Sequence, residues 1–324
     1  MQIRNLLAIV LMVVVATIDY ETTRADTYTS PAPAGEAYTI QGEYSGNIDT
    51  WGGSWGAQVV SLGNSRVSVF FYPGGLPGDG FLVDSNTKKL DAKLDGKTAE
   101  GSSDEFRVSI GNSRLSVMDL DGKSLGDLAK LNRQSTTLGA VGPEGSIVLF
   151  DGTGVDKFRD ASLVDGRYLS KGCESIESFG DHQLHIEFNI PFMPKDRGQG
   201  RGNSGVYVQG RYEIQILDSF GLEVKDNECG GIYQVAKPLH NMCYPPLTWQ
   251  TYDIDFTAAK HDAQGGKTSN AIITVRQNGV IIHDSVELPS HTPGKYPEAS
   301  SPGPLYLQDH GNPVVFQNIW VVKK

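Results

Sequence analysis

Positively charged residues are scarce in this sequence. Its 28 Lys and Arg residues are outnumbered by 38 Asp and Glu residues, which gives a formal net charge of −10 at pH 7. No basic stripe offers the clustered cations that would neutralise a phosphate backbone. The composition therefore argues against a nucleic-acid partner.

Long apolar runs are also missing. The run over residues 6–18 has 13 residues, whereas a helix that crosses a bilayer needs about 20. Arg4 precedes this run and a small-residue site at Thr23-Arg24-Ala25 follows it, which predicts an export signal over residues 1–25 that is cleaved after Ala25. We expect a secreted or periplasmic protein without a membrane span.

Cysteine is rare, with three residues in the chain. In an oxidising compartment Cys229 and Cys243 are the natural disulfide pair, because they bracket an expected strand and loop. Cys173 is then left over, and we expect it to be a small buried side chain. The alternative, a thiolate metal site, lacks the close cysteine spacing that such sites show.

Several motifs that carry known chemistry are absent. The sequence has no phosphate-binding Gly loop, no His-Glu-x-x-His zinc helix and no Gly-x-Ser-x-Gly nucleophile elbow. The clustered Asp residues leave open a site for a divalent cation such as calcium, although no ligand spacing demonstrates one. The motifs therefore assign no cofactor.

Turn residues and short alternating strands are what the sequence has in abundance. It contains 38 Gly, and the segments between them alternate apolar and polar positions, which predicts an all-β fold. Length and turn clusters predict an exposed leader at 26–37, a small accessory β domain at 38–131, a linker at 132–145 and a larger domain at 146–324.

Two features stand out in the smaller domain. GNSRVSVF at 63–70 returns as GNSRLSVM at 111–118, which hints at two equivalent hairpins. Trp51 and Trp55 could form a sugar-stacking platform, but such residues are more often core or interface anchors.

Alternation is clearest in the larger domain. Leu184, Ile186, Phe188 and Ile190 share one face of a predicted strand, which leaves His185 and Glu187 on the other. Asn278-Gly279 accepts the positive φ that a two-residue hairpin turn demands. Many antiparallel strands over about 180 residues indicate a two-sheet sandwich of jelly-roll type.

Residues 203–221 contain two more strands joined by a turn at Gln209-Gly210. Strand parity predicts that Tyr212, Ile214 and Ile216 pack inside while the polar residues between them point outward. If neighbouring strands bring their polar faces together, one concave sugar-binding surface would hold the following set: His185, Glu187, Arg211, Glu213, Gln215, Gln308 and His310. The alternative is that each is an ordinary solvated strand residue.

Five separated motifs resemble the 3-keto-disaccharide hydrolase family. They are LFDG at 149–152, NSGVYVQGRYEIQILDS at 203–219, CGGIY at 229–233, NMCYPPLTWQTYDIDF at 241–256 and GPLYLQDHGNPVVFQNIWV at 303–321. The resemblance covers residues 146–324. It implies a concanavalin-like lectin/glucanase jelly roll that acts on glycosides whose glucose C3 is oxidised to a ketone.

A C3 ketone makes a distinct cleavage route available. The ketone acidifies the C2 proton, so a base can remove it, the enolate can expel the C1 leaving group, and water can add back. The resemblance and strand parity favour Glu213 as the base, with Glu187 as the alternative. Gln215 stands where a second carboxylate would, which argues against ordinary two-carboxylate hydrolysis. His310 is the expected proton donor because its reference pKa lies near 6.5.

The remaining candidates are predicted to bind a glycoside or oligosaccharide substrate. Arg211 or Asn203 would polarise the ketone or hold sugar hydroxyls, and Asp218 would ligate a cation or cap a turn. The other predicted contacts are Gln215, Gln308, Tyr233 and Trp249. A non-catalytic, lectin-like carbohydrate-binding module is the alternative function, because a fold does not fix an activity.

Overall fold

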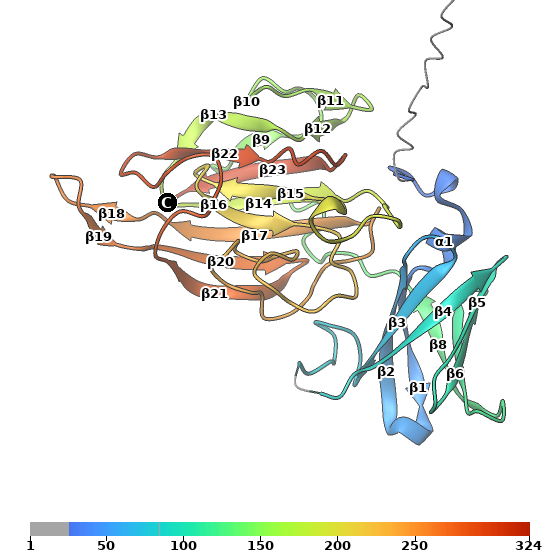
Figure 1. The fold of residues 1–324 in the computed structure, drawn as a ribbon. Coiled ribbons are helices and arrows are strands. Elements are labelled where there is room, and N and C mark those ends of the chain that lie inside the picture. Colours follow the sequence, from blue (N-terminus) through green and yellow to red (C-terminus); the bar gives the residue numbers. More distant parts are fainter. Residues whose placement is uncertain (1–25, 84) are drawn as a thin grey trace, which may run out of the picture.

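The computed structural model describes residues 26–83 and 85–324, and almost all of its regular structure is β. The predicted export signal lies outside the described residues. A closed barrel lies at one end of a two-sheet sandwich (Figure 1). The all-β prediction is therefore confirmed. None of the helices in the described ranges is long and apolar enough to cross a membrane.

The barrel is antiparallel throughout, and each strand pairs with the next before the last closes onto the first. Its strands are β1 Gly42–Ile48, β2 Gly53–Ser61, β3 Arg66–Pro73, β4 Lys88–Asp95, β5 Thr98–Ser102, β6 Arg107–Gly111, β7 Arg114–Met118 and β8 Ser124–Leu131. Side chains fill the interior. Trp51 and Trp55 pack edge-to-face in this core with ring centroids 5.0 Å apart, so they serve as core anchors.

The repeated GNSR segments form two matching hairpin turns. Asn64 and Ser65 have φ of 50° and 59° between β2 and β3, and Asn112 and Ser113 have the same values between β6 and β7. Positive φ at both central residues is what a type I′ turn requires. Since the two hairpins are four strands apart in a closed barrel of eight, they lie on opposite sides of it.

The sandwich consists of a five-stranded and an eight-stranded sheet. The first has the order β10 Phe158–Arg159, β13 Cys173–Phe179, β22 Gly303–Leu307, β15 Ser204–Val208 and β16 Tyr212–Ile216. The second has the order β11 Leu163–Val164, β12 Tyr168–Ser170, β23 Val315–Lys323, β14 His182–Asn189, β17 Trp249–Thr257, β20 Ala271–Gln277 and β21 Val280–Leu288, with β9 Ile147–Phe150 paired to β23. A separate hairpin joins β18 Lys260–His261 and β19 Lys267–Ser269.

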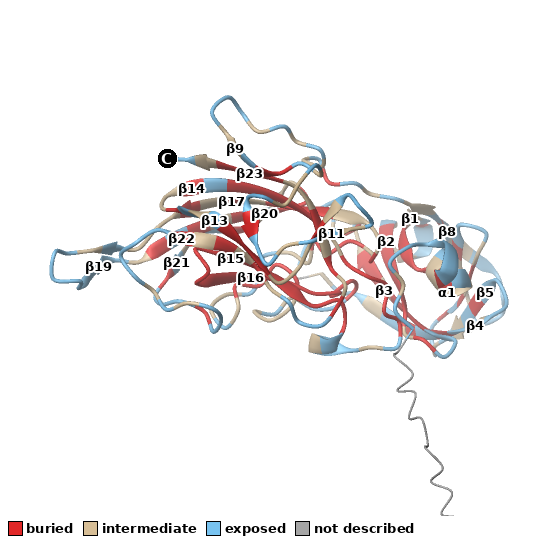
Figure 2. Ribbon diagram, turned by 90° about the horizontal axis from the view of Figure 1, so that it is seen from above, coloured by how far each residue is buried: buried red, intermediate tan, exposed pale blue. Residues whose placement is uncertain are grey.

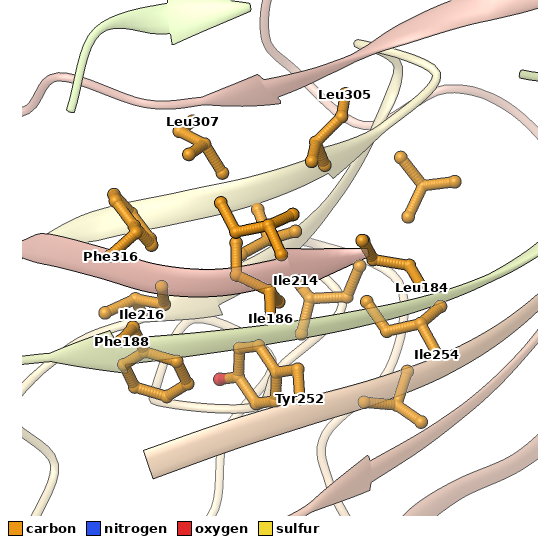
Figure 3. Packing of buried hydrophobic residues seen from close by; sticks show 14 of the residues in the cluster. Leu184, Ile186, Phe188, Ile214, Ile216, Tyr252, Ile254, Leu305, Leu307 and Phe316 are labelled. Carbon is orange, nitrogen blue, oxygen red and sulfur yellow. The ribbon is translucent and has the colours of Figure 1, made fainter. Parts of the chain in front are cut away.

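The predicted strand parities hold in the sandwich core. Ile186 and Phe188 of the larger sheet lie beside Ile214 and Ile216 of the smaller one (Figure 3). Buried residues concentrate in the strands of both the barrel and the sandwich (Figure 2). The hairpin turn at Asn278-Gly279 is also confirmed, with φ of 55° and 85°.

Short helices occur mainly around the barrel: η1 Ala32–Ala34, α1 Gly35–Ile40, η2 Asp49–Trp51 and, in the sandwich, η3 Gly198–Gly200. The leader is mostly exposed but tethered, since the backbone N–H of Tyr28 donates to the carbonyl of Phe192 at 3.0 Å. The segment at 132–145 is held against the larger sheet, where Thr137 Oγ1 donates to Asp253 Oδ2 at 2.6 Å.

The predicted disulfide is wrong. Cys229 and Cys243 are both buried and free, although the two thiols are hydrogen-bonded to each other. Cys229 Sγ also lies 3.3 Å from Gln277 Nε2, and Cys243 Sγ donates to the carbonyl of Leu217 at 3.4 Å. The pair is therefore part of a buried hydrogen-bond network. Cys173 is buried in the core, as expected.

Candidate active site

Glu213 lies on the outer face of the five-stranded sheet. It begins a row of cross-strand neighbours on four adjacent strands. The row continues with Tyr207 on β15, Tyr306 on β22 and Glu174 on β13. Alternation along β16 sends Tyr212 into the core and Glu213 to the other side. This confirms the predicted parity, and it places a carboxylate at one end of a polar row.

Glu213 is nonetheless shielded from water, with 3% of its surface exposed. Burial raises the pKa of Glu213 to about 7, while a hydrogen bond donated by the Tyr207 hydroxyl partly opposes that rise. The same Tyr207 hydroxyl accepts a hydrogen bond from Gln308 Nε2 at 3.1 Å. A carboxyl with this pKa exchanges a proton near neutral pH, which suits a general base.

Gly205 makes room for this carboxylate. A Cβ at position 205 would lie 2.4 Å from Glu213 Oε1. Because the obstructing atoms belong to the Glu213 side chain, an added methyl would displace the carboxylate and leave the backbone in place.

We therefore expect Gly205→Ala to fold normally and to lower kcat/KM by about 10- to 100-fold, since a shift of about 1 Å in a reacting group can have that effect. Steady-state kinetics and thermal unfolding measure both. Gly180→Ala is the matched control, because the space around Gly180 is open. An unchanged rate in Gly205→Ala would show that the position of Glu213 does not matter.

Three amide oxygens near Glu213 have no hydrogen-bond partner among the described residues: Asn203 Oδ1, Gln215 Oε1 and Gln308 Oε1. Asn203 and Gln215 are 1% and 2% exposed. Buried acceptors without donors are uncommon in folded proteins. The surroundings of Glu213 are therefore suited to a ligand with several hydroxyl donors.

Glu174 is the other carboxylate in the polar row. It lies three strands from Glu213, which corresponds to about 14 Å, and it already contacts Arg159, Lys295 and Tyr296. Hydrolysis by two carboxylates needs a separation of about 5 to 9.5 Å. This row therefore does not supply the ordinary pair.

Glu187 lies on the opposite face of the molecule, which corrects the prediction of one shared surface. It projects outward from the eight-stranded sheet, beside a hollow of about 670 Å³. Its carboxylate accepts hydrogen bonds from Gly139 N at 2.6 Å, Gln317 Nε2 at 2.7 Å and Asn318 Nδ2 at 2.8 Å.

These contacts decide the protonation of Glu187 and of its neighbour His185. Burial alone would raise the pKa of Glu187, but hydrogen bonds from His185, Asn318 and Gln317 hold it below the ordinary value. Burial alone would lower the pKa of His185, but Asp253 and Glu187 raise it. Although a hollow lies beside Glu187, a fully bonded carboxylate is a poor base, so we favour Glu213.

Comparison with known proteins agrees with the five sequence motifs. The family model described as a 3-keto-alpha-glucoside-1,2-lyase-like domain matches residues 145–322. The chain belongs to this family.

A solved structure from Parabacteroides distasonis ATCC 8503, described as a candidate glycosyl hydrolase, is 31% identical with a TM-score of 0.51, and the match covers 56% of this chain and 85% of that one. A second structure from the same organism, with the same description, is 18% identical with a TM-score of 0.41 and coverage of 56% and 97%. A search of curated proteins found no match.

Two further predicted residues of this 3-keto-alpha-glucoside-1,2-lyase-like domain have structural contacts. Arg211 Nη1 donates to Gln209 Oε1 and to the carbonyls of Ala299 and Ser301, so Arg211 holds a loop and is not directed at a ketone. Asp218 forms a buried ion pair with Arg201 at 2.6 Å.

The remaining predicted residues divide between the two faces. Trp249 lies on the eight-stranded sheet against Tyr168, away from Glu213. Tyr233 lies beside Glu213: the backbone N–H of Tyr233 donates to the backbone carbonyl of Glu213 at 3.3 Å. His310 is exposed in the loop after β22. In the described ranges, no three His, Cys, Asp or Glu side chains are grouped as a cation site would require.

Sequence reasoning missed three members of the site: Tyr207, Gly205 and Gln199. Tyr207 and Gly205 lie within the NSGVYVQG segment, and their outward parity follows from the same alternation that selected Glu213. Gln199 lies in a Gly-rich turn without periodicity, so no sequence pattern points to it.

Proposed function

We propose that this protein is an exported enzyme that cleaves 3-keto-glycosides by elimination and hydration. The supporting observation is the convergence, on the family's own motif residues, of one buried carboxyl with a pKa of about 7 and three amide oxygens that lack donors. A single base next to hydroxyl-binding groups suits proton abstraction from a ketosugar. It does not suit the two-carboxylate route.

In the proposed reaction Glu213 takes the proton from C2, and the C2–H electron pair forms an enolate with the C3 ketone. The enolate then forms the C1–C2 double bond, the C1–O bond breaks, and the leaving oxygen receives a proton, which we assign to His310. Water adds across the double bond to complete a net hydrolysis. No oxidant or reductant is consumed.

Tyr207 has a role in this sequence that follows from its hydrogen bonds. Its hydroxyl donates to Glu213 while Glu213 is ionised. Once Glu213 has taken up the C2 proton it is a weaker acceptor. We assign the released Tyr207 hydroxyl to the enolate oxygen, which as an anion is a stronger acceptor than the carbonyl of Pro293, 3.4 Å from that hydroxyl. Asn203 offers only its oxygen, because its Nδ2 is bound to Gln199, and is therefore assigned to a sugar hydroxyl.

The direct test uses 4-nitrophenyl 3-keto-glucosides of both anomeric forms in D₂O. We expect release of 4-nitrophenol and a product that carries deuterium at C2, with no release from the unoxidised glucosides. Release without deuterium at C2 would exclude the elimination route. Binding without release would favour the lectin-like alternative.

The pH dependence gives a further prediction. Glu213 acts as a base only when it is ionised, and its pKa is raised to about 7. For the 4-nitrophenyl substrates, whose leaving group departs without a proton from His310, we therefore expect kcat/KM to rise with pH to a plateau above about pH 7. It should be about 100-fold lower at pH 5, since each unit below the pKa reduces the ionised fraction tenfold. A profile whose midpoint lies near 4.3, the reference value for Glu, would contradict the assignment.

A further inference from the structure

Gln199 connects two of the amide groups whose oxygens have no donor. Its Oε1 accepts a hydrogen bond from Asn203 Nδ2 at 3.0 Å and another from Gln215 Nε2 at 3.1 Å. Its own Nε2 donates to the carbonyl of Asn227 at 2.8 Å. One side chain therefore fixes two others, and the Asn227 carbonyl fixes that side chain in turn.

The direction of these bonds determines what the site can recognise. An amide has two donor hydrogens on nitrogen and one acceptor oxygen. Because the nitrogens of Asn203 and Gln215 face Gln199, their oxygens are turned away from it and have no partner among the described residues. If either amide rotated by half a turn, the site would present a donor in place of an acceptor.

We propose that Gln199 is a positioning residue that sets the specificity of this site. By holding Asn203 and Gln215 as acceptors, it selects a sugar ring that presents a hydroxyl donor to each of them. This inference rests on the proposed function for the identity of the ligand as a glycoside. It adds which part of the ring is recognised and which residue enforces that recognition.

The spacing of the site fits a single pyranose. Glu213 and Gln215 lie two residues apart on one face of β16, which separates them by about 7 Å. We place C2 of the ring at Glu213, which assigns the hydroxyls on the far side of the ring, at C4 and C6, to the amide oxygens. Gln308 follows β22 and its backbone N–H donates to the carbonyl of Gly205 on β15 at 2.9 Å. Its Nε2 is already bound to the Tyr207 hydroxyl.

The decisive experiment compares 3-keto-glucoside substrates with their 4-deoxy and 6-deoxy analogues. In the natural protein we expect loss of at least one of these hydroxyls to lower kcat/KM by about 100-fold, since a buried acceptor is then left without a donor. Gln199→Met keeps the size of the side chain but cannot hold the two amides. We expect it to raise KM by about 10-fold, to change kcat little, and to reduce the deoxy penalty to about 10-fold or less.

Two variants separate this role from a loss of folding. Gln199→Glu keeps an oxygen that accepts from both amides but loses the Nε2 donor to the Asn227 carbonyl, so it should retain part of the discrimination, more than Gln199→Met. Gln183→Met is the matched control, because Gln183 is an exposed glutamine on the opposite sheet, and it should leave both rate and discrimination unchanged. An unchanged deoxy penalty in Gln199→Met, with normal turnover, would overturn the inference while leaving the proposed function intact.

Absence of turnover in the natural protein would instead count against the proposed function. Calorimetry would then measure the Kd of the unoxidised parent glucoside and of its 4-deoxy and 6-deoxy analogues. A deoxy penalty on binding that Gln199→Met removes would still support the positioning role. Failure of the natural protein to bind any of these sugars would overturn it.

Discussion

Glu213→Gln is expected to lower kcat/KM on a 3-keto-glucoside by about 10²- to 10⁴-fold, the range that one general base contributes. Gln has nearly the same shape as Glu and can still accept a hydrogen bond from Tyr207, so the site should keep its geometry. It cannot take a proton from carbon. The loss should therefore fall on kcat, with a small change in KM, and the midpoint near pH 7 should disappear from any residual activity.

Two other substitutions make this result specific. Glu223→Gln changes an exposed carboxylate that lies shortly after β16 in the chain, and it should leave the rate unchanged. Glu187→Gln removes the alternative base on the opposite face. We expect it to affect stability more than turnover, because Glu187 ties residues 139, 317 and 318 together. Loss of activity in Glu187→Gln with full activity in Glu213→Gln would reverse the assignment.

Local patterns in the sequence predicted the strands of the sandwich well. Alternation of Ile186 and Phe188, and of Ile214 and Ile216, identified their core faces because side chains on a strand alternate between its two faces. The Asn278-Gly279 turn followed from residues that tolerate positive φ. These are short-range effects, and each can be judged from a few neighbouring residues.

The sequence did not reveal which strands share a sheet. Glu187 and Glu213 have the same parity relative to the core, yet β14 and β16 belong to different sheets, so the two carboxylates point in opposite directions. Strand pairing depends on contacts between distant segments, which no local pattern contains. Gln199 accepts hydrogen bonds from Asn203 and Gln215. It could not be found from its neighbours in the chain for the same reason, because Gln215 lies on a strand that follows it.

The disulfide prediction shows a related limit. Cys229 and Cys243 do meet in the fold, as their spacing suggested, but their sulfur atoms are engaged with Gln277, Tyr252 and the Leu217 carbonyl. Proximity follows from the path of the chain. Whether two thiols are joined depends on what else surrounds them, and that is decided by side chains from several other strands.

Asp218→Ala is expected to destabilise the protein by about 3 to 5 kcal/mol, because it leaves the guanidinium of Arg201 buried without its counter-charge. Arg201 and Asp218 are 5% and 4% exposed, and Arg201 Nε lies 2.6 Å from Asp218 Oδ2. The guanidinium also lies 3.5 Å from the carbonyl of Ser61 at the end of β2. The ion pair therefore supports both the sandwich and its contact with the barrel.

Urea unfolding, with the barrel and the sandwich followed separately, measures this change in the free energy of unfolding. Asp156→Ala is the control, because Asp156 is 77% exposed in its ion pair with Lys157 at 3.6 Å, and surface substitutions of this kind usually stay within about 0.5 kcal/mol. The double variant Arg201→Met/Asp218→Leu should recover most of the loss, since an apolar pair carries no buried charge. If Asp218→Ala instead stayed fully stable and lost activity that added calcium restored, Asp218 would be a cation ligand and its pairing with Arg201 would be incidental.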